Sequence, residues 1–358
     1  METQKKLLID RILNTFAEQK ATDLHMTVGI PPVLRIDEKL IPLDNEPIID
    51  QELLQSFVGE ILDEGQLKTL EEKREIVIAY QFNKQARFRV NIYYQKRALA
   101  AYLRIIGTQI VPLNQLGLPL GALEKISDLQ EGLVLVSGAF GSGKTTTSAS
   151  IIDHINTLRS AYILSIEKPI EYIFTNKKSI VEQREVGRDA LNFEKALSLI
   201  TQEDVDVVFV SELSSPEIIK QALNVATSGR LVIANIEADT IIKTLEFLIN
   251  HFPSNEQLQI RHQLSINLEG IICQQLVPNI GGGQVAIAEI MISTPPIRSL
   301  IKEGSLNQIS NIIQTSREEG MVPLDWSLAE LVKTNTILLD QALKHASDPT
   351  HLKHLLRV

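Results

Sequence analysis

The chain has 358 residues, which is enough for two or three domains with large apolar cores. Its 35 lysines and arginines against 44 aspartates and glutamates leave a net charge of −9, so the global charge gives no support to nucleic-acid binding. The single cysteine, Cys273, excludes an internal disulfide, and no apolar run approaches the ~18 residues of a membrane-spanning helix. We therefore expect a cytoplasmic protein with no signal peptide and no transmembrane segment.

The first 106 residues are predicted to form a mixed α+β domain. Apolar residues recur at helical spacing over 3–19, and two strands joined by a Gly-Ile-Pro-Pro turn follow over 21–43. Residues 49–74 are mostly helical in pattern, and two or three strands are expected over 75–106.

A linker and a second domain follow. Residues 107–119 contain two glycines and two prolines, which mark the break between the domains. From residue 120 to residue 295, helical patterns alternate with short apolar runs, and this alternation predicts a doubly wound α/β core. The expected strands of this core are 133–137, 161–166, 205–210 and 231–235.

Further segments complete the predicted fold. Three glycines at 281–283 precede an apolar run at 285–291, a pattern that predicts a hairpin late in the second domain. Residues 183–186 are expected in a loop, and the last region, 296–358, is expected to be helical. The predicted fold class is therefore α/β, with an α+β domain ahead of a doubly wound domain and C-terminal helices.

The segment from Gly138 to Thr145 matches the phosphate-binding pattern G-x-x-x-x-G-K-[ST] at every position. It lies between a predicted strand and a predicted helix, the context in which backbone N–H groups and a helix N-terminus bind phosphates. Lys144 is expected to reach the β- and γ-phosphates of ATP, and Thr145 to bind Mg²⁺. The predicted nucleotide contacts are Gly138, Ala139, Phe140, Gly141, Ser142, Gly143, Lys144, Thr145 and Thr146.

Carboxylates follow two of the predicted strands. One apolar strand leads to Glu212, an arrangement like a Walker B motif, so Glu212 is expected to act at the Mg²⁺ ion together with Thr145. Another strand leads to Glu167 and Glu171. Either of these glutamates could polarise the attacking water, because the spacing alone does not decide between them.

Other short motifs are spread along the whole chain. They are Asp23-Leu24-His25, Gly29 to Pro32, Ala86 to Asn91, Ser165 to Glu171, Gln183 to Val186, Gly281 to Gly283, Glu289 to Met291 and Thr294 to Arg298. With the P-loop, these motifs resemble the secretion ATPases of type IV pili and type II secretion, on the PilT/PilU retraction branch. The segments 166–167, 169–173 and 273–278 look closer to PilU than to PilT.

The resemblance implies a hexameric ring whose subunits have an N-terminal PAS-like domain and a RecA-like ATPase domain. Glu171 then matches the catalytic glutamate of the family, and Glu212 its Walker B glutamate. Arg89 and Arg104 match arginines that cross onto bound nucleotide, a role that suits a planar guanidinium which stays charged. The implied partner is the platform protein of the pilus, at the cytoplasmic side of the inner membrane.

Several positions depart from the family's pattern near the expected site. Lys168 replaces the aspartate of an I-E-D-P-I-E box, Arg230 and Glu237 replace both histidines of a His box, and Phe247 replaces an arginine. A carboxylate beside the γ-phosphate would oppose ATP binding, since two like charges ~4 Å apart repel by about 4 kcal/mol at an effective dielectric of ~20. We hypothesise that Lys168 and Glu237 pair and so keep the site near neutral.

Two functions are compatible with this pattern. The first is a working ATPase motor, in a homo-hexamer, that retracts the pilus in twitching motility. The second is a degenerate paralogue that turns ATP over slowly or not at all and acts in a mixed ring with an active retraction ATPase. A ring that moves DNA or RNA is a third class, which the net charge of −9 and the lack of a nucleic-acid motif in the first domain oppose.

Overall fold

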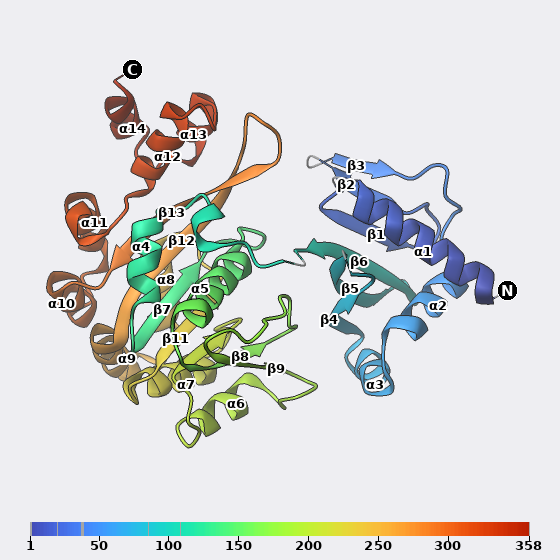
Figure 1. Ribbon diagram of the computed structural model, residues 1–358, viewed down its shortest axis with the longest axis horizontal. Coiled ribbons are helices and arrows are strands. Elements are labelled where there is room, and N and C mark those ends of the chain that lie inside the picture. The colour runs from blue at the N-terminus through green and yellow to red at the C-terminus, as the bar shows by residue number, and fades with distance from the viewer. Residues whose placement is uncertain (1, 20, 37–38, 85, 108, 358) are drawn as a thin grey trace. The chain divides into compact units, whose positions relative to one another are not determined.

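The structure is a computed structural model, shown as a ribbon in Figure 1. Among the residues that it describes, no helix is both long and apolar enough to cross a lipid bilayer. The described residues are 2–19, 21–36, 39–84, 86–107 and 109–357.

The chain divides into two compact units. The first unit contains Met1–Gln109 together with a short segment from later in the chain, Lys168–Ile173. The second unit contains Ile110–Glu167 and Phe174–Val358.

The first unit is a six-stranded antiparallel sheet that carries its helices on one face (Figure 1). Side chains alternate between the two faces of each strand, so Leu24, Phe88 and Leu103 form an apolar face with α1 and α2. Phe16 of α1 stacks on Phe88 with ring centroids 5.1 Å apart. The strands, in their order across the sheet, are β3 (Lys39–Pro42), β2 (Val33–Ile36), β1 (Asp23–Thr27), β6 (Ala98–Ile106), β5 (Arg87–Gln95) and β4 (Glu75–Gln81).

Side-chain caps fix the starts of two helices of this unit. The helices predicted over 3–19 and 49–74 are confirmed, but the second one is two helices. Asp50 accepts a hydrogen bond from the backbone N–H of Leu53, and Asp63 and Gln66 form a capping box, so a new helix begins after Asp63. The helices are α1 (Glu2–Glu18), α2 (Gln51–Ile61) and α3 (Glu64–Lys73).

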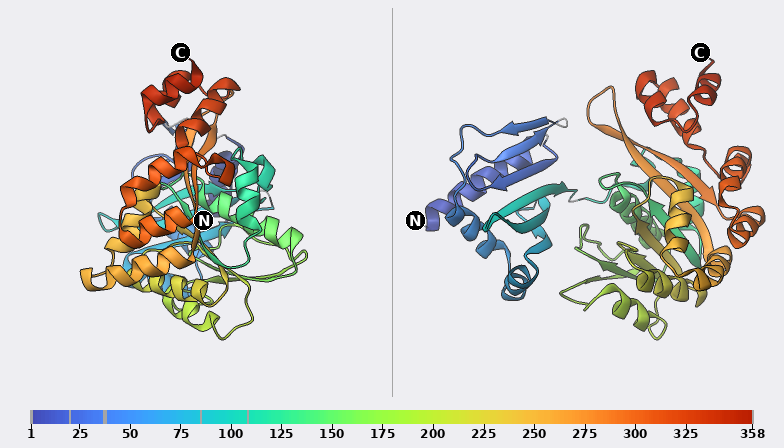
Figure 2. Two further views of the ribbon diagram at one scale, coloured as in Figure 1. Left: turned by 90° about the vertical axis from the view of Figure 1, so that its left-hand side faces the viewer. Right: turned by 180° about the vertical axis from the view of Figure 1, so that it is seen from behind.

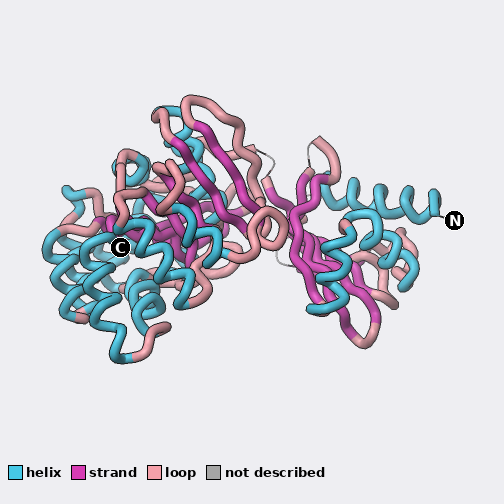
Figure 3. The backbone as a smooth tube through the Cα atoms, turned by 90° about the horizontal axis from the view of Figure 1, so that it is seen from below, coloured by secondary structure: helices cyan, strands magenta, loops and turns pink. Residues whose placement is uncertain are grey.

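The second unit is a seven-stranded sheet in which β13 runs antiparallel to β12 and all other neighbours are parallel. The doubly wound core and its four expected strands are confirmed. Figure 3 distinguishes the helices and strands of the described residues by colour. The strands, in their order across the sheet, are β13 (Gln284–Ile292), β12 (Leu268–Pro278), β7 (Gly132–Ser137), β11 (Leu231–Ile236), β10 (Val207–Val210), β8 (Tyr162–Glu167) and β9 (Ile180–Glu185).

Helices cover both faces of this sheet (Figure 2). Leu133 and Leu135 of β7 share an apolar core with residues of α6 to α9. Val134 and Val136 alternate with them and therefore face the other side, where α5 contacts β7 and β11. These helices are α4 (Leu120–Ser127), α5 (Lys144–Leu158), α6 (Phe193–Ile200), α7 (Pro216–Thr227), α8 (Ile241–Asn250) and α9 (Ser254–Asn267).

The predicted hairpin is confirmed as β12 and β13, which extend beyond the strand β7 as a two-stranded ribbon (Figure 1). Val277 and Ile287 of this ribbon pack against the last helices of the chain. The helices predicted for the C-terminal region are also confirmed. These helices are α10 (Pro295–Glu303), α11 (Ile309–Thr315), α12 (Leu324–Lys333), α13 (Leu339–His345) and α14 (Pro349–Leu356).

The loop expected at 183–186 is wrong, because residues 183–185 belong to the strand β9. This strand lies at the edge of the sheet and none of its residues is fully buried. An edge strand needs no continuous apolar run, so its polar sequence resembles that of a loop. The sequence does not predict the edge strand β3 of the first unit either, because β3 has only four residues and ends in Pro42, which is unfavourable in a strand pattern.

Candidate functional site

The P-loop joins β7 to α5 within the second unit. All residues of β7 are buried, which explains why an apolar run forms this central strand. Gly143 has a φ of 87°, which residues with a Cβ rarely adopt. A Cβ at Gly138 would overlap the backbone oxygen of Gln274, so the start of the loop packs directly on β12. The loop conformation therefore requires glycine at both positions.

The N-terminus of α5 is suited to an anion. Gly143 is its N-cap and supplies no side-chain hydrogen bond, so the first N–H groups of the helix have no side-chain cap. Lys144 Nζ donates to the carbonyl oxygens of Gly138, at 3.0 Å, and Ala139, at 2.8 Å, which holds the ammonium group over the loop. An ammonium group and the N–H groups of a helix's first turn are the donors that nucleotide phosphates need, so these residues fit the predicted ligand.

Four parallel strands end at the same edge of the second unit's sheet. β7 pairs with β11, β11 with β10, and β10 with β8, all in parallel. Ligands of open α/β sheets bind at the carboxyl ends of such strands. Glu237 follows β11, Glu212 lies two residues after β10, and Glu167 ends β8. The P-loop and these three glutamates therefore lie along one edge of the sheet.

The carboxylates at this edge differ in burial and bonding. Glu167 is 2% exposed and accepts hydrogen bonds from Ser165 Oγ, at 2.7 Å, and Gln183 Nε2, at 2.9 Å. Glu212 is half-buried, and Thr145 is half-buried in the first turn of α5. A hydroxyl and a carboxylate are the hard oxygen donors that Mg²⁺ binds together with phosphates, so this donor pair fits the predicted ion.

Glu171 belongs to the first unit, although its segment follows β8 in the chain. Arg87 of β5 donates to the carbonyl oxygen of Ile170 at 2.7 Å, and Arg89 Nη1 donates to Glu171 Oε1 at 2.9 Å. The structure thus brings together two of the predicted site residues, Arg89 and Glu171, as an ion pair. It also shows that two arginines of β5 bind the segment that carries Glu171.

Arginines form a row across the polar face of the first unit's sheet. Arg89 and Arg104 are direct cross-strand partners on β5 and β6, Arg104 is the partner of Asp23 on β1, and Asp23 is the partner of Arg35 on β2. Like charges directly opposite each other in a sheet repel. The carboxylates of Asp23 and Glu171 offset this repulsion, with Arg104 Nε at 2.7 Å from Asp23 Oδ1. The row is a rigid array of guanidinium groups that suits an anionic ligand.

Asp23 is the buried partner of this row. Burial of its carboxyl raises its pKa, but hydrogen bonds from Arg104, Tyr102 and Thr22 outweigh burial, so the pKa lies below its ordinary value of 3.8. Asp23 is 1% exposed, and the Tyr102 hydroxyl donates to it at 2.6 Å. Because the folded pKa is depressed, the charged carboxylate stabilises the fold above the unfolded pKa, and this contribution is lost as the pH falls through the folded value.

We expect Asp23→Asn to lower the free energy of unfolding of the first unit by about 2 to 3 kcal/mol near neutral pH, because Arg104 loses its charged partner. The difference from the parent protein should shrink as the pH falls below about 4, where the parent carboxylate is protonated as well. This difference in the free energy of unfolding is measured from urea unfolding curves of the intact chain, in which the deuterium uptake of β1 and β6 reports on the first unit. Asp44→Asn, at an exposed position, is the control and should change little. A pH-independent difference would contradict the assignment.

Arg230 does not lie near the P-loop, and the expectation that this departure belongs to the site is wrong. It precedes β11 and therefore lies at the opposite edge of the sheet. Its guanidinium donates to Ser228 Oγ, at 2.8 Å, and to the carbonyl oxygen of Glu203, at 3.0 Å. Phe247 of α8 packs against the apolar core, with its ring centroid 3.9 Å from that of His251. Both replacements have local structural partners in the second unit.

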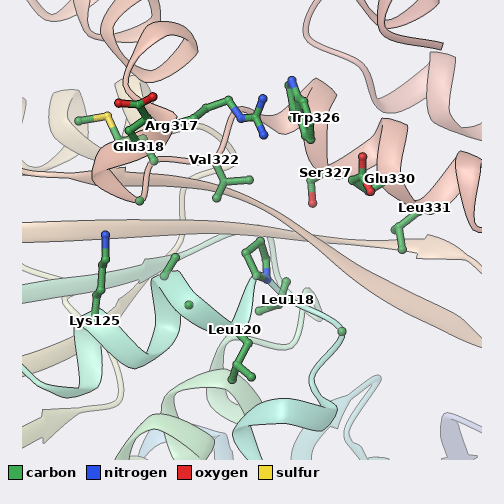
Figure 4. Close-up of a pocket in the computed structure, with 16 residues that line it drawn as sticks. Leu118, Leu120, Lys125, Arg317, Glu318, Val322, Trp326, Ser327, Glu330 and Leu331 are labelled. Carbon is green, nitrogen blue, oxygen red and sulfur yellow. The ribbon is translucent and has the colours of Figure 1, made fainter.

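A separate cavity of about 570 Å³ lies between the start of α4 and the helix α12 (Figure 4). Leu118 and Leu120 form one wall, and Val322 and Trp326 form the other. The Arg317 guanidinium lies over the Trp326 ring, 3.2 Å from its centroid. Among the described residues that line this cavity, none belongs to the P-loop, so it is not the nucleotide site.

The sequence did not indicate three residues that the structure places at these sites. Arg87 binds the Glu171 segment, Asp23 binds Arg104, and Gln274 contacts the P-loop. Asp23 and Arg87 lie within motifs that carry the family resemblance, but the sequence assigns neither of them a role at the site. Gln274 is 2% exposed within an apolar strand, and a buried polar residue of that kind requires partners.

Comparisons with known proteins agree with this architecture. A family model described as Type II/IV secretion system protein matches residues 4–282. The chain is 38% identical over 341 residues to the type IV pilus retraction ATPase PilT of Pseudomonas aeruginosa, a match that covers 95% of the chain and 98% of PilT. A crystal structure of the pilus retraction motor PilT with bound ADP is 39% identical, with a TM-score of 0.83 and coverage of 97% of this chain and 99% of that one.

Three short segments look closer to PilU than to PilT, but the sequence as a whole is more similar to PilT. The chain is 33% identical over 350 residues to the type IV pilus ATPase PilU of the same organism, which covers 98% of the chain and 91% of PilU. The identity to PilT is higher, at 38%. The matched family model and these two relatives show that the chain is a member of the type II/IV secretion system protein family and is of the PilT/PilU type.

Proposed function

We propose that the chain is a type IV pilus retraction ATPase that binds MgATP at the P-loop and hydrolyses it. The observation that supports the proposal is the glycine loop at the N-terminus of α5, over which the ammonium group of Lys144 is held. This loop occurs in a chain that is 38% identical to a pilus retraction ATPase, and the match covers 98% of that ATPase.

The second unit supplies the nucleotide site. Residues 138–146 surround the phosphates, with Lys144 at the β- and γ-phosphates. Thr145 and Glu212 hold Mg²⁺, which when bound offsets the negative charge of the phosphates. Glu212 is half-buried and lies two residues after β10, an inner strand of the sheet, so its backbone is anchored near the carboxyl end of that strand.

The first unit supplies the residues that act on the reacting phosphate. Glu171 accepts a proton from the attacking water, and Arg89 and Arg104 donate to the γ-phosphate. Arg89 is bound to Glu171 in the structure, so its transfer to a phosphate would also release the Glu171 carboxylate. The arginine pair and the glutamate segment belong to one unit, so a rotation of that unit would move all three groups together.

A ring of six subunits would allow the first unit of one subunit to meet the P-loop of the next. The ring is a homo-hexamer or a mixed ring with a second retraction ATPase. It works in the cytoplasm, at the inner-membrane base of the pilus, where it binds the platform protein. Hydrolysis at successive subunits would then turn the units against each other and drive twitching motility.

One observation favours the second candidate function, a slow or inactive paralogue that regulates an active partner. Glu237 is exposed at the end of β11, the strand next to β7, where a histidine is typical of the family. A carboxylate at that place opposes a bound triphosphate unless a cation offsets it. Pairing of Lys168 with Glu237 would provide this offset, and it remains a prediction.

Phosphate release by the purified protein separates the two functions. We expect MgADP to bind and ATP to be hydrolysed above the level of Lys144→Ala, in which both properties should be lost because the phosphates lose their charged donor. Binding of MgADP with phosphate release no faster than in Lys144→Ala would select the regulatory function. Absence of binding to MgADP and MgATP would contradict both functions.

A further inference from the structure

The side chain of Gln274 connects the P-loop to α5 from the neighbouring strand. Cys273 of β12 is paired with Ser137, the last residue of β7, so Gln274 lies level with the start of the loop. Its Nε2 donates to the Ser142 carbonyl oxygen at 2.8 Å, and its Oε1 accepts from Thr147 Oγ1 at 2.6 Å. Gln274 is 2% exposed and Thr147 is fully buried, so water does not compete for these bonds.

These bonds fix the direction of a peptide group that would face the nucleotide. The peptide between Ser142 and Gly143 is trans, so its C=O and N–H point in opposite directions. Because Gln274 holds the carbonyl oxygen of Ser142 on the β12 side, the N–H of Gly143 points to the other side of the peptide. A loop that binds phosphate through backbone N–H groups depends on the direction of each such group.

The glycines of the motif meet the same residue. A Cβ at Gly143 would lie 2.8 Å from Gln274 Nε2, and a Cβ at Gly138 would overlap the Gln274 backbone oxygen. Both ends of the loop thus pack on Gln274. Flipping of the Ser142–Gly143 peptide would break the bond to Gln274 and leave a buried amide without a partner, which is costly.

A second buried hydrogen bond between α5 and the sheet can be compared with the bond between Thr147 and Gln274. Ser148 Oγ donates to Asn235 Oδ1 of β11 at 2.6 Å, and both residues are buried. This bond anchors the same turn of α5 to the strand on the other side of β7. It does not touch the loop peptides, whereas the Gln274 bonds connect the helix and the loop.

We propose that Gln274 is a positioning residue for nucleotide binding, which orients the Ser142–Gly143 peptide towards the phosphates and couples it to α5 through Thr147. The inference rests on the proposed function, because it assumes that the P-loop binds nucleotide. The hairpin strand β12, and not only the motif itself, then determines the affinity of the loop for MgADP and MgATP.

The test measures MgADP affinity and the melting temperature of the unliganded full chain for a set of variants. Gln274→Met loses both bonds and Gln274→Glu loses the donor to Ser142, so each should weaken MgADP binding about tenfold, the effect of one buried hydrogen bond. Thr147→Val should weaken it by a smaller factor, and Thr147→Ser should restore it. Combining Thr147→Val with Gln274→Met should add little to Gln274→Met alone.

Ser148→Ala is the matched control and should keep its MgADP affinity within about twofold of the parent, whatever its melting temperature. A lower melting temperature for Gln274→Met and Gln274→Glu with unchanged MgADP affinity would overturn the inference and leave the proposed function intact. Failure of the parent protein itself to bind MgADP would overturn the proposed function and, with it, this inference.

Discussion

Changing Glu171 to glutamine is expected to lower phosphate release about 100-fold or more, while MgADP binds with unchanged affinity, as is typical when a general base is removed. Glutamine has the shape of glutamate and can still accept the hydrogen bond from Arg89, so the segment should keep its place on the first unit. It cannot accept a proton from water. The loss should therefore appear in the rate of hydrolysis and not in the dissociation constant for MgADP.

The matched comparison is Glu167→Gln, four residues earlier in the chain. Glu167 is buried and already accepts bonds from Ser165 and Gln183, so we expect it to hold the end of β8 and not to face water. Its replacement should lower stability more than turnover. A large loss of turnover in Glu167→Gln with near-parent activity in Glu171→Gln would exchange the two roles and contradict our assignment.

The central strands and the P-loop could be predicted because their cause is local. A strand that is covered on both faces must be apolar throughout, and β7, β10 and β11 are completely buried. A loop that binds phosphate through its backbone N–H groups needs glycines and a lysine at fixed spacing. Each of these features depends only on residues that are close together in the chain, so the sequence alone indicates them.

Partnerships between distant residues could not be predicted. The sequence indicated Arg89 and Arg104 separately, but their cross-strand pairing depends on the register of β5 and β6. The segment that carries Glu171 was expected to belong with the ATPase core, whereas contacts from Arg87 and Arg89 group it with the first unit. Likewise, Arg230 was counted with the site because its motif contains a site residue, although the two ends of β11 lie at opposite edges of the sheet.

Changing Arg89 to alanine is expected to lower phosphate release by about 1,000-fold, the effect of removing an arginine that stabilises a transferring phosphate. Its Nη1 binds Glu171, but its side chain is still 30% exposed, so the guanidinium group is accessible to an anion. Arg89→Lys keeps the charge but loses the planar fork, so it should restore only a small part of the activity. Phosphate release at saturating MgATP measures the effect.

Arg35 is the matched control for Arg89, since it lies in the same row and is bound to Asp23 at 3.9 Å. Arg35→Ala should leave turnover nearly unchanged, and an equal loss in both variants would indicate a general effect of the row's charge.

Mixing Arg89→Ala with Lys144→Ala tests whether Arg89 acts on the neighbouring subunit. Each subunit of a mixed ring then supplies the group that the other lacks, so part of the activity should return. If Arg89 served only its own P-loop, every subunit would stay defective and the mixture would remain inactive.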